Sequence, residues 1–322
     1  VTRTKLVIPG DSATIDKLSV SFSSDSSSMT ASAASAFIKA DASAKIPVSE
    51  AGRLFSSYRD HLDVLFPGKD STLVASDLPV VNAKIDITGD KLVSVLLRDT
   101  SAGFRNISIS LNTSRDGKNL YTSLKGKDIK FKTLSISGFD ASLSDSSRIL
   151  DLKLKGTKIA FGAQKLNSVI LESHFSDWKS QSKVSAYDEN SRELYRLDLR
   201  SETDQGIVTV QSPSGMIILN SNEWILDKPQ ILAVDLRSHA FSPSLRMHTG
   251  NSSLSLSDKN ENGWKSLVLT LSDVNLKTIV NPESLPGNPM FTASGSISLG
   301  TSADKETRVN GGINLRNISW SD

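Results

Sequence analysis

Apolar and polar residues alternate with a period of two along most of the chain. Because successive side chains of a strand point to opposite faces, this alternation predicts strands that are apolar on one face and polar on the other. The runs are Leu18-Val20-Phe22, Ile38-Ala40-Ala42-Ala44-Ile46, Val81-Ala83-Ile85-Ile87, Ile107-Ile109-Leu111, Leu150-Leu152-Leu154, Tyr195-Leu197-Leu199, Leu254-Leu256, Leu267-Leu269-Leu271, Phe291-Ala293-Gly295-Ile297-Leu299 and Val309-Gly311-Ile313-Leu315.

Turn-forming residues separate these runs. Asp116-Gly117 followed by Lys118-Asn119 is a good hairpin candidate, and Thr88-Gly89-Asp90 and Lys155-Gly156 act similarly. Strands and helices do not alternate, so we do not expect a doubly wound α/β fold. We therefore predict an all-β fold: an elongated, curved antiparallel sheet that runs through residues 1–322 as one continuous segment.

One segment departs from the period of two. Between residues 47 and 66 the apolar positions fall on one face of a helix, with Leu54, Tyr58 and Leu62 among them, and Pro67-Gly68 ends the pattern. We predict an amphipathic helical insertion at 47–66. A second short segment, 273–285, fits either a helix or a strand followed by a loop.

The apolar face of the predicted sheet has few large side chains to fill a core. Aromatic residues make up 6% of the chain, whereas a two-sheet sandwich fills a core about 10 Å thick with large side chains. Either the sheet folds onto itself or its apolar face stays partly open as a groove, and an open apolar face of more than a few hundred Å² marks a binding surface. The predicted groove lining is Leu18, Val20, Ile38, Ala40, Ala42, Ala44, Val81, Ala83, Ile85, Ile107, Ile109, Leu152, Leu267, Leu269, Phe291, Ala293 and Ile297, with Leu54, Tyr58 and Leu62 contributed by the helix.

Residues that carry catalysis are not arranged in any recognisable motif. The four histidines, His61, His174, His239 and His248, are scattered without metal-ligand spacing, and there are no cysteines. Nucleophile and phosphate-binding signatures are absent. Lys+Arg is 37 and Asp+Glu is 35, and the basic residues alternate with acids and serines. We therefore expect no enzyme activity, no cofactor, no metal and no nucleic-acid partner.

Two segments near the C-terminus resemble a known family. Residues 222–257 begin with Trp224-Ile225-Leu226 and end with Ser253-Leu254-Ser255-Leu256-Ser257; residues 263–300 contain Asp273-Val274-Asn275-Leu276, Leu285-Pro286 and Gly295-Ser296-Ile297-Ser298-Leu299-Gly300. These patterns are similar to the repeats of the TamB/AsmA-like family, the translocation and assembly module proteins. The strand and helix from Ala44 to Phe66 resemble an interruption in TamB-like proteins of the Bacteroidetes type.

The resemblance implies both a fold and a function. Members of that family form a U-shaped sheet with an apolar interior, the β-taco. They are anchored at the inner membrane, span the periplasm and are implicated in moving phospholipid to the outer membrane, with a TamA/BamA-type outer-membrane barrel as a partner. On this basis the chain is expected to be an excised periplasmic piece of a longer protein, with its anchor outside residues 1–322, that conducts phospholipid or other acyl-chain lipid between inner and outer membrane.

Three other interpretations compete with a lipid conduit. The chain could be a scaffold or chaperone for outer-membrane β-barrel assembly, binding partners by β-augmentation at a sheet edge. It could be a β-solenoid adhesin with a packed interior. It could itself be an outer-membrane barrel, although such barrels need aromatic girdles and the chain has 4 Trp and 4 Tyr.

Overall fold

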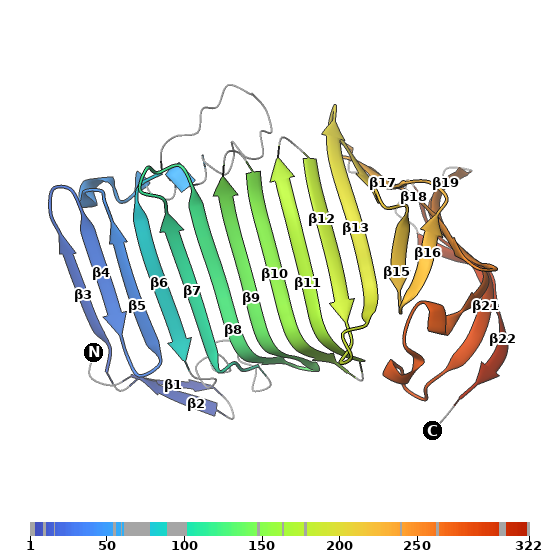
Figure 1. Cartoon of the computed structure of the whole chain (residues 1–322), viewed down its shortest axis with the longest axis horizontal. Coiled ribbons are helices and arrows are strands. Elements are labelled where there is room, and N and C mark those ends of the chain that lie inside the picture. Colours follow the sequence, from blue (N-terminus) through green and yellow to red (C-terminus); the bar gives the residue numbers. More distant parts are fainter. Residues whose placement is uncertain are drawn as a thin grey trace. The chain divides into compact units, whose positions relative to one another are not determined.

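The fold is built almost entirely of antiparallel strands (Figure 1). The computed structural model describes residues 4–8, 11–15, 17–53, 56–58, 60, 78–88, 102–146, 149–162, 164–176, 179–238, 240–261, 264–302 and 307–320. Strands account for 72% of this described part, and twenty of them belong to one long antiparallel sheet. The predicted all-β fold with a long antiparallel sheet is confirmed.

The chain divides into two compact units, Val1–Phe161 with Ser168–Asp177, and Gly162–Asn167 with Trp178–Asp322. The strands of the first unit are β1 (Thr4–Ile8), β2 (Asp11–Ile15), β3 (Ser19–Ser24), β4 (Met29–Ala34), β5 (Ile38–Ala44), β6 (Val81–Thr88), β7 (Asn106–Thr113), β8 (Leu120–Phe131), β9 (Leu134–Ser146) and β10 (Ile149–Phe161). Strands β1 and β2 pair only with each other in a separate two-stranded sheet. From β3 to β10 each strand pairs with the next one along the chain, and the turn at residues 114–119 joins β7 to β8 as the sequence predicts.

The second unit continues the same connectivity. Its strands are β12 (Lys179–Tyr187), β13 (Glu193–Asp204), β14 (Ile207–Gln211), β15 (Met216–Leu219), β16 (Asn222–Leu226), β17 (Gln230–Asp235), β18 (Ala240–Thr249), β19 (Ser252–Glu261), β20 (Trp264–Asn275), β21 (Met290–Ser302) and β22 (Thr307–Ser319). Strand β11 (Gln164–Ser176) contributes residues to both units.

The second unit contains a local irregularity in which two long strands are each interrupted. Strand β13 pairs with β14 at Arg200–Asp204 and with β15 at Arg196, because residues 212–215 bulge out between β14 and β15. Residues 227–229 interrupt β16 and β17 at the same level, where the Ser212 amide donates to the Pro229 carbonyl at 2.8 Å. Between β13 and β18 the sheet therefore follows two parallel routes around the interruption. One route is β13–β14–β17–β18, and the other is β13–β15–β16–β18.

Little of the apolar surface is packed into a core. The accessible surface is 19,899 Å², whereas a compact monomer of 34.7 kDa would expose about 13,000 Å². Among the described residues, Trp224 is the largest fully buried side chain, and it belongs to a small cluster with Ile217, Leu226, Met247 and Val274. Among the described strands, most apolar side chains are accordingly only partly buried.

Strands β8 and β10 end with the same sequence and the same bend. Leu120-x₃-Leu-Lys-Gly-x₂-Ile-x-Phe131 recurs thirty residues later as Leu150 to Phe161. Asp128 and Lys158 both have left-handed backbones, at φ +52° and +47°, a region that non-glycine residues seldom adopt. The bend folds the next isoleucine over a glycine: a Cβ on Gly126 would lie 2.8 Å from Ile129 Cδ1, and one on Gly156 would lie 2.7 Å from Ile159 Cδ1.

A similar left-handed residue occurs near the ends of two strands of the second unit. Asp273 in β20 (φ +50°) precedes Val274, and Asn317 in β22 (φ +53°) precedes Ile318. All four sites share a left-handed residue, a β-branched residue, any residue and then a large apolar one. This short pattern is a sequence signal that the period of two does not reveal.

The helical insertion is present where the structure describes it. After a 3-10 turn at Val48–Glu50, residues 53, 56–58 and 60 are helical. Leu54 and Leu62, which were predicted to face the groove, lie outside the described residues. The alternative helix at 273–285 is instead the end of β20 followed by two 3-10 turns, Leu276–Thr278 and Pro282–Ser284.

Replacing Gly295 by alanine should destabilise the second unit. Gly295 has φ +143°, and a Cβ there would lie 2.2 Å from the Gly312 carbonyl oxygen of the neighbouring strand. The strain should lower the free energy of unfolding by about 1–3 kcal/mol, measured by urea denaturation. The matched control is Gly312→Ala, where nothing lies within 4 Å of the new Cβ and the change should stay within about 0.5 kcal/mol. Equal effects of the two variants would contradict this account of the β21–β22 contact.

Candidate functional site

The apolar residues of the first unit form continuous rows across its strands. Directly paired residues of antiparallel strands point to the same face, so the registers decide which side chains share a surface. One row is Val20, Ala33, Ala40, Ile85, Ile109, Leu124, Ala141 and Leu154; the next is Phe22, Ala31, Ala42, Ala83, Leu111, Thr122, Leu143 and Leu152; a third is Ile38, Ile87, Ile107, Gly126, Phe139 and Gly156. We call this surface the apolar face of the first unit.

Much of this apolar face is accessible to solvent. Val20 and Phe22 on β3 are 69% and 59% exposed, and Ile85 on β6 is 37% exposed. Most of the remaining members are partly buried. The side chains touch their neighbours within the sheet, but no described second layer covers the middle of the face.

The opposite face of the same strands is polar. Its rows include hydroxyl pairs, with Ser21 Oγ 2.7 Å from Ser32 Oγ and Ser110 Oγ 2.7 Å from Ser123 Oγ. A surface ion pair joins Lys125 to Asp140 at 3.4 Å. Exposed pairs of this kind contribute about 0–1 kcal/mol, so this face keeps the sheet hydrated and adds little to its stability.

The described residues of the insertion between β5 and β6 meet the apolar face at one edge. Ala44, Thr113, Leu120, Asp145 and Leu150 lie at this edge, and all are buried. The Pro79 carbonyl accepts hydrogen bonds from the Tyr58 hydroxyl at 3.4 Å and from the Thr113 hydroxyl at 2.9 Å.

Two further features tie the insertion to this edge. Leu78 is buried, and its amide donates to the Gly117 carbonyl at 2.7 Å. Burial raises the pKa of the Tyr58 phenol, a shift that its hydrogen bond with Thr113 opposes. The predicted helix residue Tyr58 therefore lies at one end of the rows, where it bonds to Pro79, two residues before the predicted lining residue Val81.

The second unit carries an apolar face of its own. Leu245, Leu256, Leu269, Ile297 and Gly311 form one row, and Met247, Leu254, Leu271, Gly295 and Ile313 form the next. Leu267 pairs with Leu299, which is 48% exposed, and Leu299 pairs with Val309, which is 67% exposed. Apolar side chains again remain open toward strands β21 and β22.

The part of this apolar face around Trp224 is covered by the segment that follows β20. Trp224 is completely buried, and its indole Nε1–H donates to the Thr278 carbonyl at 3.1 Å. The Asn220 side chain donates to the Lys277 carbonyl at 2.6 Å, and Ile279 packs on the cluster around Trp224. We call residues 276–280 the cap segment.

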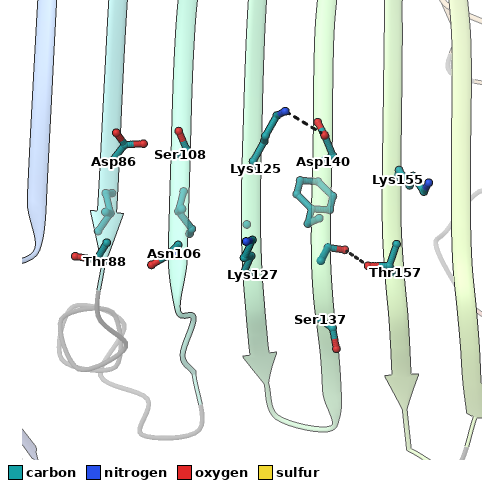
Figure 2. A pocket seen from close by; sticks show the side chains of 15 residues that line it. Asp86, Thr88, Asn106, Ser108, Lys125, Lys127, Ser137, Asp140, Lys155 and Thr157 are labelled. Atoms are coloured by element: carbon teal, nitrogen blue, oxygen red, sulfur yellow. Dashed lines mark hydrogen bonds and ion pairs between the residues drawn. The ribbon is translucent and has the colours of Figure 1, made fainter.

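A shallow hollow of about 570 Å³ lies on the polar face of the first unit (Figure 2). Asp86, Ser108, Lys125, Asp140 and Lys155 lie in one row across it. The Ser108 hydroxyl and the Lys84 ammonium hold the pKa of the Asp86 carboxyl below its usual value. Lys125, Asp140 and Lys155 are exposed, and Lys125 pairs with Asp140 across the strands at 3.4 Å, so these charged groups remain in contact with water.

The registers place the predicted lining residues on these two faces, except for Leu18, which precedes β3, and Phe291, which lies at a register shift in β21. Leu18, Val20, Ile38, Ala40, Ala42, Ala44, Val81, Ala83, Ile85, Ile107, Ile109 and Leu152 belong to the first unit, and Leu267, Leu269, Phe291, Ala293 and Ile297 to the second. Ala44 and Ala293 are each 5% exposed and Val20 is 69% exposed. Whether these residues contact a lipid stays a prediction.

Several members of the rows were absent from the predicted lining. Leu111, Leu124, Leu143, Leu154 and Phe139 share the face through their registers with predicted residues. Leu111 and Leu154 belong to runs that alternate in the sequence, so the signal was present. The cap segment could not have been found in this way, because its contact with Trp224 joins positions more than fifty residues apart.

Searches for a metal site, for a membrane-spanning helix and for related proteins all gave negative results for the described residues or for the sequence. The described residues contain no cluster of three or more His, Cys, Asp or Glu side chains that could hold a metal ion. A membrane-crossing length of apolar helix is likewise not found in the part of the chain that the structure describes. Comparisons with protein-family models, with curated proteins and with solved structures find no match to this chain.

Replacing Trp224 by alanine should release the cap segment. The variant loses a fully buried indole and its hydrogen bond to Thr278, which should lower the free energy of unfolding by about 3–5 kcal/mol. Hydrogen exchange measured by mass spectrometry should show faster exchange in residues 276–280. Trp320→Ala is the matched control, because Trp320 is 69% exposed; similar exchange in both variants would mean that Trp224 does not hold the cap segment.

Proposed function

We propose that the chain conducts the acyl chains of phospholipids along the apolar faces of its sheet. The observation that carries the proposal is the set of apolar rows that cross the strands without a described covering layer, with Val20, Phe22 and Ile85 exposed to solvent. Exposed apolar surface on this scale favours an apolar occupant over water.

The energetics suit sliding better than tight capture. Burial of an acyl chain gains about 0.8 kcal/mol per CH₂ group, and the gain is similar wherever the chain lies along a uniform row. The rows present only hydrocarbon side chains for most of their length, so an acyl chain meets no fixed polar partner there. The lipid headgroup remains in water at the margin of the face.

Side-chain size leaves room on the apolar face at β4 to β6. Ala31, Ala42 and Ala83 are direct partners in one row, and Ala33 and Ala40 lie in the neighbouring row. A methyl side chain keeps the surface apolar while allowing an acyl chain to approach the backbone. Branched residues such as Ile85 and Ile109 stand next to these positions and would line the sides of the path.

The setting of the proposal comes from the family resemblance. By analogy with TamB-like proteins, the full-length protein would be anchored in the inner membrane, and this part would lie in the periplasm. A TamA/BamA-type outer-membrane barrel would be its partner through the full-length protein. These statements depend on the TamB-like patterns at 222–300 and on no contact within the chain.

A second candidate function is a scaffold for assembly of outer-membrane barrels by β-augmentation. The observation that favours it is β22, a thirteen-residue strand whose described register is with β21. It carries exposed Val309 and Ile318, and exposed Trp320 follows it directly. It is the outermost strand of its unit in Figure 1. A long strand with a free edge is a template for pairing with an extended partner.

Ala42→Asp should abolish lipid binding by the first unit. Ala42 lies in the apolar row between Ala31 and Ala83, and an acyl chain covering it would leave the new carboxylate without water. Phospholipid that co-purifies with the wild-type chain, measured by native mass spectrometry after expression in a lipid-containing host, should fall at least about tenfold. Ser43→Asp is the matched control, because Ser43 is the next residue of β5 and points to the polar face.

Two outcomes would contradict the conduit. Wild-type chain that is folded and free of lipid would remove its basis, as would equal lipid loss in the Ala42 and Ser43 variants. If unfolded outer-membrane-barrel peptides bind the lipid-free chain, and bind the Ala42 variant equally well, the scaffold function is supported instead.

A further inference from the structure

Five basic side chains gather at one end of strands β8 to β10. Arg105, Lys127, Lys130, Lys132 and Lys158 are all exposed. Residues 102–105 extend the sheet beside β8, since the Gly103 amide donates to the Lys130 carbonyl at 3.0 Å and the Arg105 amide to the Lys127 carbonyl at 2.9 Å. We call residues 103–105, 127–136 and 157–161 the basic tip.

The basic tip carries more net positive charge than the whole chain does. Asp128 is the one acidic residue within these ranges, and it pairs with Arg105 at 3.4 Å. The whole chain has a formal charge of only +2. The sequence therefore shows mixed charge on average, whereas the fold concentrates an excess of four positive charges at this tip.

Two phenylalanine side chains project among these charges. Phe131 is 44% exposed and Phe161 is 64% exposed. Both pair with Leu134 of the strand between them, so the three apolar side chains form one short row at the strand ends. Lys132 Nζ lies 5.5 Å from the centre of the Phe131 ring.

The backbone itself holds this arrangement. The left-handed residues Asp128 and Lys158 bend β8 and β10 three residues before each phenylalanine. The same bend folds Ile129 and Ile159 back over glycines of their own strands. The aromatic residues are thus presented by a feature that is built twice, at equivalent places in two strands.

Exposed aromatic side chains with lysines nearby match the chemistry of a bilayer surface. Aromatic side chains are enriched at the headgroup level of membranes, and basic clusters are attracted to the negative surface of anionic lipids. Ionic attraction alone explains neither the two exposed rings nor their common row. A soluble polyanion would use the lysines but would leave both phenyl rings in water.

We propose that the basic tip docks on the surface of an anionic bilayer. Phe131 and Phe161 insert at the level of the headgroups, while Lys130, Lys132 and Lys158 contact lipid phosphates. The basic tip lies just beyond the third apolar row, where Ile129 and Ile159 fold over Gly126 and Gly156. Its contact with a bilayer does not require the rows to carry lipid.

The test is flotation of the folded chain with lipid vesicles in about 0.1 M salt, where surface charges are only partly screened. Vesicles of phosphatidylcholine are compared with vesicles in which about a third of the lipid is phosphatidylglycerol. The wild type should bind the anionic vesicles at least about tenfold more tightly, and high salt should weaken that binding.

Two variants separate the parts of the basic tip. Replacing Lys130, Lys132 and Lys158 by serine should remove the preference for anionic vesicles. Phe131→Ser with Phe161→Ser should weaken binding at least about tenfold while keeping the preference, because the lysines remain. The control for the lysine variant replaces three exposed lysines elsewhere, Lys118, Lys265 and Lys277, by serine. The control for the phenylalanine variant replaces two exposed aromatic residues elsewhere, Tyr121 and Phe241, by serine. Circular dichroism confirms that each variant is folded.

Several results would overturn the proposal. One is equal binding to neutral and anionic vesicles, and another is tip variants that bind as their controls do. A third is displacement of the chain from vesicles by short single-stranded DNA while the phenylalanine variant still binds fully, because a soluble polyanion would then be the better partner. Ala42→Asp should float with anionic vesicles as the wild type does. Loss of lipid co-purification would contradict the acyl-chain conduit, and loss of vesicle binding would contradict docking of the basic tip, so the two proposals can fail separately.

Discussion

Cross-strand register is the constraint on which the rest of the structure depends. From β3 to β10, each strand is aligned so that apolar residues meet apolar residues, and a slip of one position in any strand would turn its apolar side chains to the polar face. Rows such as Ala40, Ile85 and Ile109 exist only because successive registers agree. The long apolar surface is a consequence of pairing that is maintained over many strands.

A sheet with this pattern must still protect part of its apolar surface, and the chain does so locally. In the first unit, the insertion that contains Tyr58 and Leu78 covers the end of the face at Thr113. In the second unit, the cap segment covers Trp224. Each unit thus has a small packed region among its described residues, and no described second layer covers the middle of its face. Packing at the ends of the rows therefore leaves apolar side chains such as Val20 and Leu299 exposed in between.

The all-β fold and most of the apolar rows could be predicted from the sequence, because alternation is a local property that each strand displays by itself. Leu152 and Ile109 were identified for that reason, and their registers place them on one face. The cap over Trp224 and the basic tip could not be predicted in this way. The first joins distant positions through a backbone carbonyl, and the second arises when Arg105, Lys130 and Lys158 are brought together from separate segments. A repeated Gly-x-x-Ile-x-Phe in β8 and β10 was the available clue to the tip.

The central claim is that lipid acyl chains lie against one face of the sheet and not the other. A photoreactive benzoylphenylalanine placed at Ile85, on the apolar face, or at its neighbour Lys84, on the polar face, tests that claim directly. After irradiation in cells and purification, mass spectrometry should find phospholipid attached at position 85 and little at position 84. Equal attachment at the two positions, or attachment at neither, would contradict the account.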